Sequence, residues 1–111
     1  MTFEECENLL PDKLKALGYK MVNGMMVDNV TNFHLDNDCQ DCLLRIVHAN
    51  NKSRKCICYA QNIHSKDWKT CFYKDFNDTI YEAIMDSAKN MVAQYKKYTI
   101  DLKINEISKD F

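Results

Sequence analysis

The feature of this 111-residue sequence that most constrains its fold is the stretch from Trp68 to Tyr98, WKTCFYKDFNDTIYEAIMDSAKNMVAQYKKY. Its second half predicts one long amphipathic helix, because apolar side chains recur there every three or four residues. The members of this apolar stripe are Ile80, Ile84, Ala88, Met91, Val92 and Tyr95. A single helix cannot bury such a stripe alone, so the rest of the chain must supply a sheet or a second helix.

Polar side chains mark where this helix begins. Thr79 and Glu82 have the spacing of a capping box, and residues 75–78 offer further oxygens to the first free N–H groups of the helix. Lys96 and Lys97 stand near the other end, where positive charge suits the helix dipole. We therefore expect the helix to begin near Thr79 and to end near Tyr98.

Three short segments upstream of the helix predict strands that follow one another as an antiparallel meander. Cys42–His48 is an apolar run that would also suit a helix, but the polar turn behind it favours a strand. In Cys56–Gln61 the side chains alternate, so both cysteines are expected on the core side, opposite Ile57 and Tyr59. Trp68–Tyr73 alternates in the same way.

The N-terminal part of the chain predicts a helix and a hairpin. Thr2–Leu17 has a helical apolar face and opens with a capping box, and Gly18 suits the left-handed residue that ends a helix. Pro11 predicts a kink or a division into two short helices. Within Tyr19–Asp28, the pair Asn23–Gly24 predicts a type I′ turn between two short strands.

Two further segments have less regular patterns. Asn29–Asp41 is rich in Asn and Asp, and we expect a loop there with a short strand around Phe33–Leu35. Thr99–Asn105 alternates, which predicts a last strand, with an extension of the long helix as the alternative. The predicted fold class is α+β, with a short N-terminal helix, a β-hairpin and an antiparallel meander packed against one long helix in the C-terminal half. All of it forms a single domain over residues 1–111.

Charge and hydropathy narrow the class of protein. A net charge of −1 with interspersed signs gives no overall basic field for nucleic acids or membranes. No segment approaches the roughly 20 apolar residues that span a bilayer. The first residues, MTFEECENLL, lack the basic-then-apolar order of a signal peptide. We therefore expect a cytoplasmic protein without a membrane partner.

Six cysteines leave a secreted, disulfide-bonded domain as the alternative. Sequons at Asn29, Asn51 and Asn77 fit that alternative. A reducing setting is favoured, because most of these cysteines suit small buried apolar positions.

The cysteine spacing also offers four candidate metal ligands, Cys39, Cys42, Cys56 and Cys58. Zinc takes four such ligands, usually from two short-range pairs. Neither pair has the glycine of a zinc knuckle, so we expect buried thiols and no cofactor.

No catalytic constellation is evident. The three histidines, His34, His48 and His64, lie in or beside expected loops, and none follows a recognisable nucleophile–base order. The sequence therefore predicts a protein that is not an enzyme.

Single-stranded nucleic acid is one candidate ligand. Lys52, Arg54 and Lys55 form a basic turn, and Tyr59 with Trp68 could supply a stacking platform on neighbouring strands.

Another protein is the partner that the sequence favours. Acidic side chains that could occupy a basic groove, and methionines that could make an adaptable apolar surface, are Asp36, Asp38, Asp41, Asp75, Asp78, Met25 and Met26. A small α+β unit with acidic patches and no catalytic constellation is similar to small phage or mobile-element proteins that occupy a host protein's surface. The resemblance implies an inhibitor of a host or defence factor.

Overall fold

The computed structural model describes residues 1–25, 29–35 and 42–109 of the chain. Its elements, in chain order, are α1 (Phe3–Leu17), β1 (Lys20–Met25), β2 (Asn29–His34), β3 (Leu44–His48), the short 3₁₀ turn η1 (Lys52–Arg54), β4 (Cys56–Tyr59), β5 (Lys69–Phe72), a second 3₁₀ turn η2 (Tyr73–Asp75) and α2 (Asp78–Lys109).

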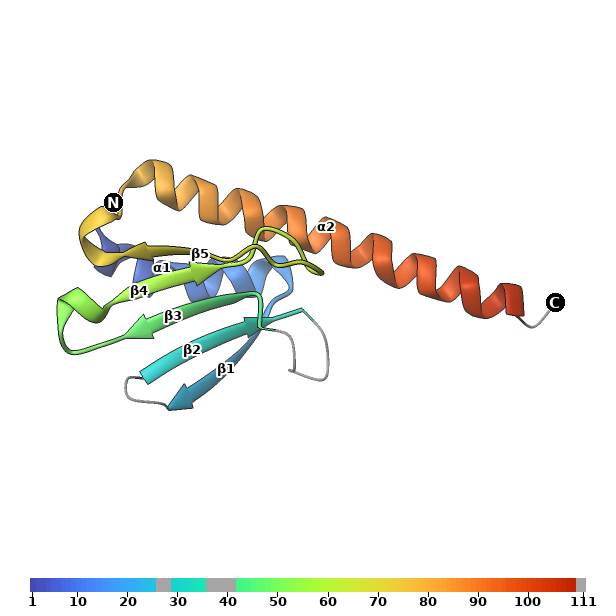
Figure 1. Cartoon of the computed structure of the whole chain (residues 1–111), viewed down its shortest axis with the longest axis horizontal. Helices are drawn as coiled ribbons and strands as arrows, with labels where there is room; N and C mark the ends of the chain where they lie inside the picture. Colours follow the sequence, from blue (N-terminus) through green and yellow to red (C-terminus); the bar gives the residue numbers. More distant parts are fainter. Residues whose placement is uncertain (26–28, 36–41, 110–111) are drawn as a thin grey trace.

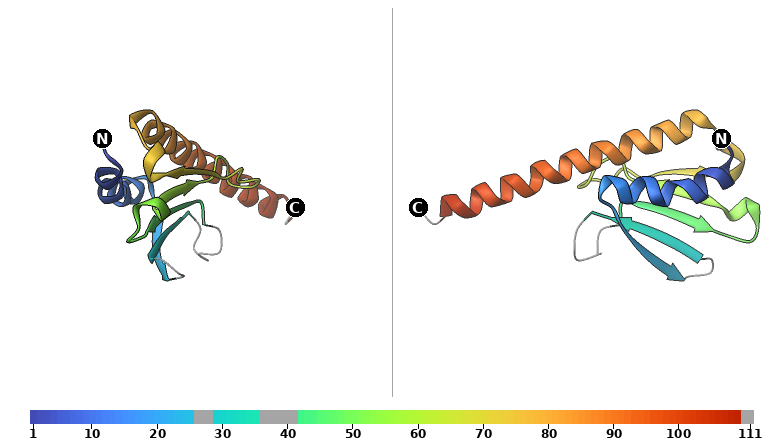
Figure 2. Two further views of the ribbon diagram at one scale, coloured as in Figure 1. Left: turned by 60° about the vertical axis from the view of Figure 1, so that its left-hand side comes forward. Right: turned by 180° about the vertical axis from the view of Figure 1, so that it is seen from behind.

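The five strands form one antiparallel sheet in the order β1-β2-β3-β4-β5. Both helices lie on the same face of this sheet: α1 runs behind it in Figure 1 and in front of it in the right-hand view of Figure 2. This arrangement confirms the predicted α+β class and the meander that leads into the long helix.

The start and end of α1 follow from local chemistry. The Thr2 hydroxyl accepts from the Glu5 N–H at 3.2 Å, and the Glu5 carboxylate accepts from the Thr2 N–H at 3.3 Å, which confirms the predicted capping box. Gly18 ends the helix with a φ of 107°, as predicted. One continuous helix passes through Pro11, so the expected division into two helices is wrong.

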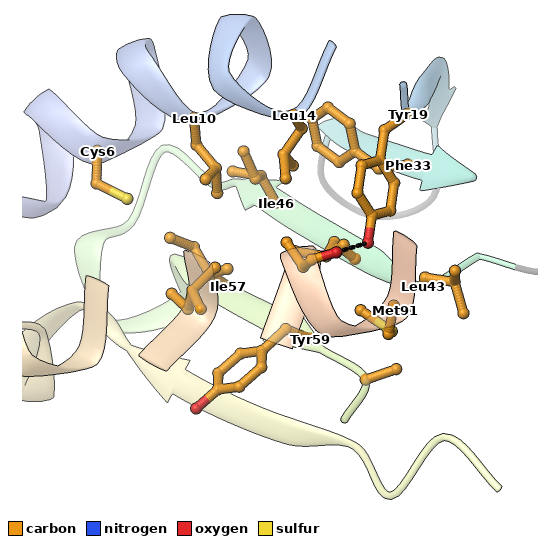
Figure 3. Close-up of a cluster of buried hydrophobic side chains, with 14 of the residues drawn as sticks. Cys6, Leu10, Leu14, Tyr19, Phe33, Leu43, Ile46, Ile57, Tyr59 and Met91 are labelled. Atoms are coloured by element: carbon orange, nitrogen blue, oxygen red, sulfur yellow. Dashed lines mark hydrogen bonds between the residues drawn. The ribbon is translucent and has the colours of Figure 1, made fainter. Parts of the chain in front are cut away.

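The core lies between the two helices and the sheet. Figure 3 shows side chains of α1, among them Leu10 and Leu14, facing the strand residues Ile46 and Ile57. From α2, Ile84, Ala88 and Met91 are fully buried. The Tyr19 hydroxyl donates to the Ala88 carbonyl at 2.8 Å, which ties the start of β1 to the middle of α2.

The predicted turn at Asn23–Gly24 is wrong. β1 runs straight through this pair to Met25, and Asn23 is opposite Thr31 in the ladder to β2. The six residue pairs of this ladder outweigh the turn preference of two residues. The loop expected over Asn29–Asp41 is corrected by the same ladder, because its first six residues form β2.

The strand expected over Thr99–Asn105 is also wrong, because α2 continues through it to Lys109. Extending an existing helix adds a hydrogen bond per residue without a new nucleus. The cap of α2 is Asn77, whose side-chain oxygen accepts from the Ile80 N–H at 2.9 Å, so Thr79 lies inside the first turn and forms no capping box. The last turns of α2 project past the sheet (Figure 1).

Candidate nucleic-acid interface

The sheet face turned away from both helices is here called the outer face, and several polar residues lie on it. Alternation along the strands assigns the two faces. One row across four strands, Thr31–Ile46–Ile57–Cys71, is buried against the helices. The adjacent row lies on the outer face, where each residue is opposite the next in the ladder: Asn32, Arg45, Cys58 and Thr70. Arg45 therefore stands in the middle of the outer face.

A hollow of about 300 Å³ opens beside Arg45 and is lined by Arg45, Cys58, Trp68 and Thr70. The Arg45 Nε donates to the Asn32 side-chain oxygen at 2.8 Å, which fixes the plane of the guanidinium group. Trp68 is 45% exposed although it is a large aromatic residue. The hollow thus joins an accessible π face to a held cation.

Two residues with positive φ lead into Trp68. Lys66 has a φ of 64° and Asp67 a φ of 45°, and residues other than glycine adopt such values at some energetic cost. Hydrogen bonds from the backbone N–H groups of Ser65 and Lys66 to the Asn62 side chain hold this turn together. The hydrogen bonds therefore hold an otherwise unfavourable backbone conformation directly before Trp68.

A second hollow, of about 440 Å³, lies at the other end of β5 and is lined by Lys52, Ser53, Phe72, Tyr73 and Lys74. The Lys52 ammonium stands 5.5 Å from the centre of the Tyr73 ring. The Tyr73 hydroxyl donates to Glu4 at 2.6 Å, and this bond lowers the pKa of the Glu4 carboxyl, with smaller help from nearby lysines. Phe72 is 47% exposed.

Charge is unevenly distributed along the chain. Between residues 44 and 74 there are seven lysines and arginines and one acid, Asp67, a net charge of +6, whereas the whole chain carries −1. The remaining residues carry 15 acids and eight lysines and arginines, a net charge of −7. The segment from β3 to β5 is therefore a basic region within a nearly neutral protein.

The structure separates the five residues proposed from sequence as a nucleic-acid site. Lys52 and Trp68 each line a hollow along β5. Tyr59 is only 5% exposed and faces the core, so the expectation that it stacks beside Trp68 is wrong. Lys55 is half-buried and its ammonium pairs with Glu7 at 3.2 Å, while Arg54 is exposed in η1.

Sequence reasoning missed Arg45, Phe72 and Lys74 as members of the site. The available signal was a single arginine inside the apolar run Cys42–His48, at a position whose neighbours are buried. Only the register of β3 with β4 places that arginine beside Cys58 and, one strand further, Thr70.

Most of the proposed protein-binding residues lie elsewhere. Asp36, Asp38, Asp41 and Met26 are outside the described residues, as is the side chain of Met25 at the end of β1. Asp75 is exposed in η2. The Asp78 carboxylate accepts from the ammonium group of Met1 at 2.8 Å, so it links the segment before α1 to the first residue of α2.

The candidate metal ligands Cys42, Cys56 and Cys58 lie on the sheet or directly before it. Cys39 lies outside the described residues, and within those residues no group of three or more Cys, His, Asp or Glu side chains could hold a metal ion. Cys56 and Cys58 are on the outer face, which corrects the expectation that they point into the core. Burial, with a smaller effect of Cys58, raises the pKa of the Cys56 thiol to about 11.

A polar chain links α1 to the sheet. His48 contacts the Glu7 carboxylate through Nδ1 at 2.8 Å and the Thr31 hydroxyl through Nε2 at 2.9 Å. The order of hydroxyl, imidazole and carboxylate matches a hydrolase triad. However, Thr31 is only 7% exposed and its hydroxyl donates to the Asn23 side-chain oxygen, which suits a structural role. These hydrogen bonds connect α1 to strands β2 and β3.

Comparisons with protein-family models, with curated proteins and with solved structures found no match. In the described part of the chain, neither helix has an apolar stretch that could cross a bilayer.

Proposed function

We propose that this protein binds single-stranded nucleic acid on the outer face of β3–β5 and catalyses no reaction on it. The observation that carries the proposal is the pair of exposed rings at the two ends of β5, Trp68 just before the strand and Phe72 at its last residue, within the segment of net charge +6. Aromatic faces stack on unpaired bases, and the surrounding cations neutralise phosphates.

The spacing of the rings suits an extended strand. Trp68 stands directly before β5 and Phe72 ends it, four residues further along, which in extended chain separates them by about 13 Å. Both rings lie beside cations, Arg45 at one hollow and Lys52 with Lys74 at the other. Bases in a duplex are already stacked on each other, so exposed rings favour a single strand.

The test uses the only tryptophan in the chain as its reporter. Trp68 fluorescence is followed while a single-stranded oligonucleotide of about twelve thymidines is added at about 50 mM salt. We expect quenching that saturates, and an affinity that falls as salt rises. The same sequence as a duplex should bind more weakly.

Matched variants make the test specific. Phe72→Ala should weaken binding by about 1–3 kcal/mol, the usual value of one stacked base. Lys74→Glu should weaken binding and flatten its salt dependence. The controls are Leu9→Ala on α1 and Lys89→Glu on α2, both exposed on the helical layer away from the outer face, which should bind like the parent protein. Absence of binding, or equal losses in the controls, would refute the proposal.

Binding to another protein is the second candidate function, favoured by the last turns of α2. Large apolar side chains there are 43–56% exposed: Ile100, Leu102 and Ile104. They follow Tyr98, whose ring packs on His64 at 5.1 Å between ring centres. Lys96, Lys97 and Lys103 flank them, with Asp101 as the only acid between residues 93 and 105. We propose that this end docks into an apolar groove with an acidic rim.

A photo-crosslinking amino acid at Ile100 tests this second function, with the same group at Asp86 as the control. We expect one discrete protein adduct from position 100 that Ile104→Asp abolishes. Light scattering on the purified protein decides whether the adduct is a second copy. Adducts of equal yield from both positions would contradict the proposal.

A reducing, cytoplasmic setting completes the proposal. It is supported by the free thiols of the five described cysteines, Cys6, Cys42, Cys56, Cys58 and Cys71. Thiol titration of the denatured protein should find all six cysteines of the sequence reactive; fewer would contradict it.

A further inference from the structure

Arg45 carries further N–H donors beside the hollow, in addition to its Nε. Its Nε is engaged by the Asn32 side-chain oxygen at 2.8 Å, and that oxygen also accepts from the Cys42 thiol at 3.3 Å. The guanidinium also interacts with the nearby Cys42 sulfur, and no other hydrogen bond of Arg45 is found within the described residues. Arginine therefore presents a fixed pair of parallel N–H donors at the hollow.

The walls of this hollow suit one flat ring. Trp68 offers an aromatic face, and the Thr70 hydroxyl donates to the Cys58 sulfur at 3.6 Å, which leaves its oxygen able to accept from a ligand. A volume of about 300 Å³ is at the small end for ligand sites, which matches a single base rather than a longer segment of the strand.

We propose that the hollow beside Arg45 is a guanine pocket, in which Trp68 stacks on the base and the Arg45 fork binds its O6 and N7. This inference rests on the nucleic-acid binding proposed above. Guanine presents two adjacent acceptors on one edge, whereas adenine places an amino donor beside N7 and thymine offers a single oxygen beside a methyl group. A phosphate would also accept from the fork, but it has no face to stack on Trp68.

The test compares thymidine oligonucleotides that differ in one central base, guanine or adenine, by quenching of Trp68. We expect the guanine oligonucleotide to bind about 5- to 150-fold tighter, which is the discrimination of one bidentate arginine contact. Arg45→Lys keeps the positive charge and loses the fork, so the ratio of the two affinities should fall to about 1.

Asn32→Ala provides a second, independent variant, because Asn32 positions the fork without touching the base. It should lower the guanine preference while the charge of Arg45 is retained. Lys89→Ala, exposed on α2 and away from the outer face, should leave the ratio unchanged. Far-UV circular dichroism checks that each variant is folded, and if Arg45→Lys does not fold, Asn32→Ala decides.

The outcomes separate the two proposals. Equal affinity of the parent protein for both oligonucleotides would overturn the guanine pocket and leave strand binding in place. An equal loss of affinity for both oligonucleotides in Arg45→Lys would assign Arg45 to a phosphate and would also overturn the pocket. No quenching by any oligonucleotide would overturn strand binding itself.

Discussion

Two isoleucines on α2 give a matched measurement of what holds this fold together. Ile84 is fully buried between the helix and the sheet, whereas Ile100 is 56% exposed on the same helix beyond the sheet. Replacing either by alanine removes the same three carbons and improves helix propensity by the same few tenths of a kcal/mol. The difference between the two variants therefore isolates burial.

The expected magnitude follows from that burial. Three buried carbons at about 0.8 kcal/mol each give roughly 2.4 kcal/mol of lost transfer free energy for Ile84→Ala. The cavity left behind adds to this, so we expect a loss of about 3–4 kcal/mol in the free energy of unfolding. Ile100→Ala should change it by no more than about 0.5 kcal/mol.

Urea unfolding followed by far-UV circular dichroism measures both variants, with the slope m checked for constancy. A difference below about 1 kcal/mol between Ile84→Ala and Ile100→Ala would refute the assignment of the core, since cavity-forming changes usually exceed that value. A large loss in Ile100→Ala would show that the end of α2 is covered in solution.

Three further predictions concern single contacts, each measured by urea unfolding. Gly18→Ala should lower the free energy of unfolding by about 1 kcal/mol through its φ of 107° alone, because an added Cβ meets nothing within 4 Å; a neutral result would contradict the left-handed cap. Glu7→Gln should cost about 1–3 kcal/mol, because His48 and Lys55 lose their shared carboxylate, and no change would contradict this link between α1 and the sheet. Burial raises the pKa of Cys6 from 9.0 to about 12, so the unfolded state loses this proton first and stability falls as pH rises through that window. Cys6→Ala should reduce this alkaline fall by up to about 1.4 kcal/mol per pH unit, and an unchanged fall would exclude the thiol as its source.

The long-range parts of this structure are those that local patterns predicted least well. The helices were predictable because their signals are local: a capping box at Thr2, a glycine at position 18 and a stripe through Ile84. The turn at Asn23–Gly24 and the strand at Thr99–Asn105 were mistaken for the opposite reason. There a local preference competed with a ladder to β2 or with a helix already formed, and the larger structure prevailed.

The net charge of the whole chain conceals how charge is distributed over the fold. A value of −1 argued against nucleic acid, yet it is the sum of +6 between residues 44 and 74 and −7 in the rest. Salt screens charges beyond about 8–10 Å, so a ligand on β5 responds to the nearby lysines and arginines more than to acids on distant turns of α2. The register of β3, β4 and β5 then puts Arg45 and Trp68 at one hollow, although they are 23 positions apart in the sequence. A site of this kind is built by strand pairing, which is why a motif search along the chain could not find it.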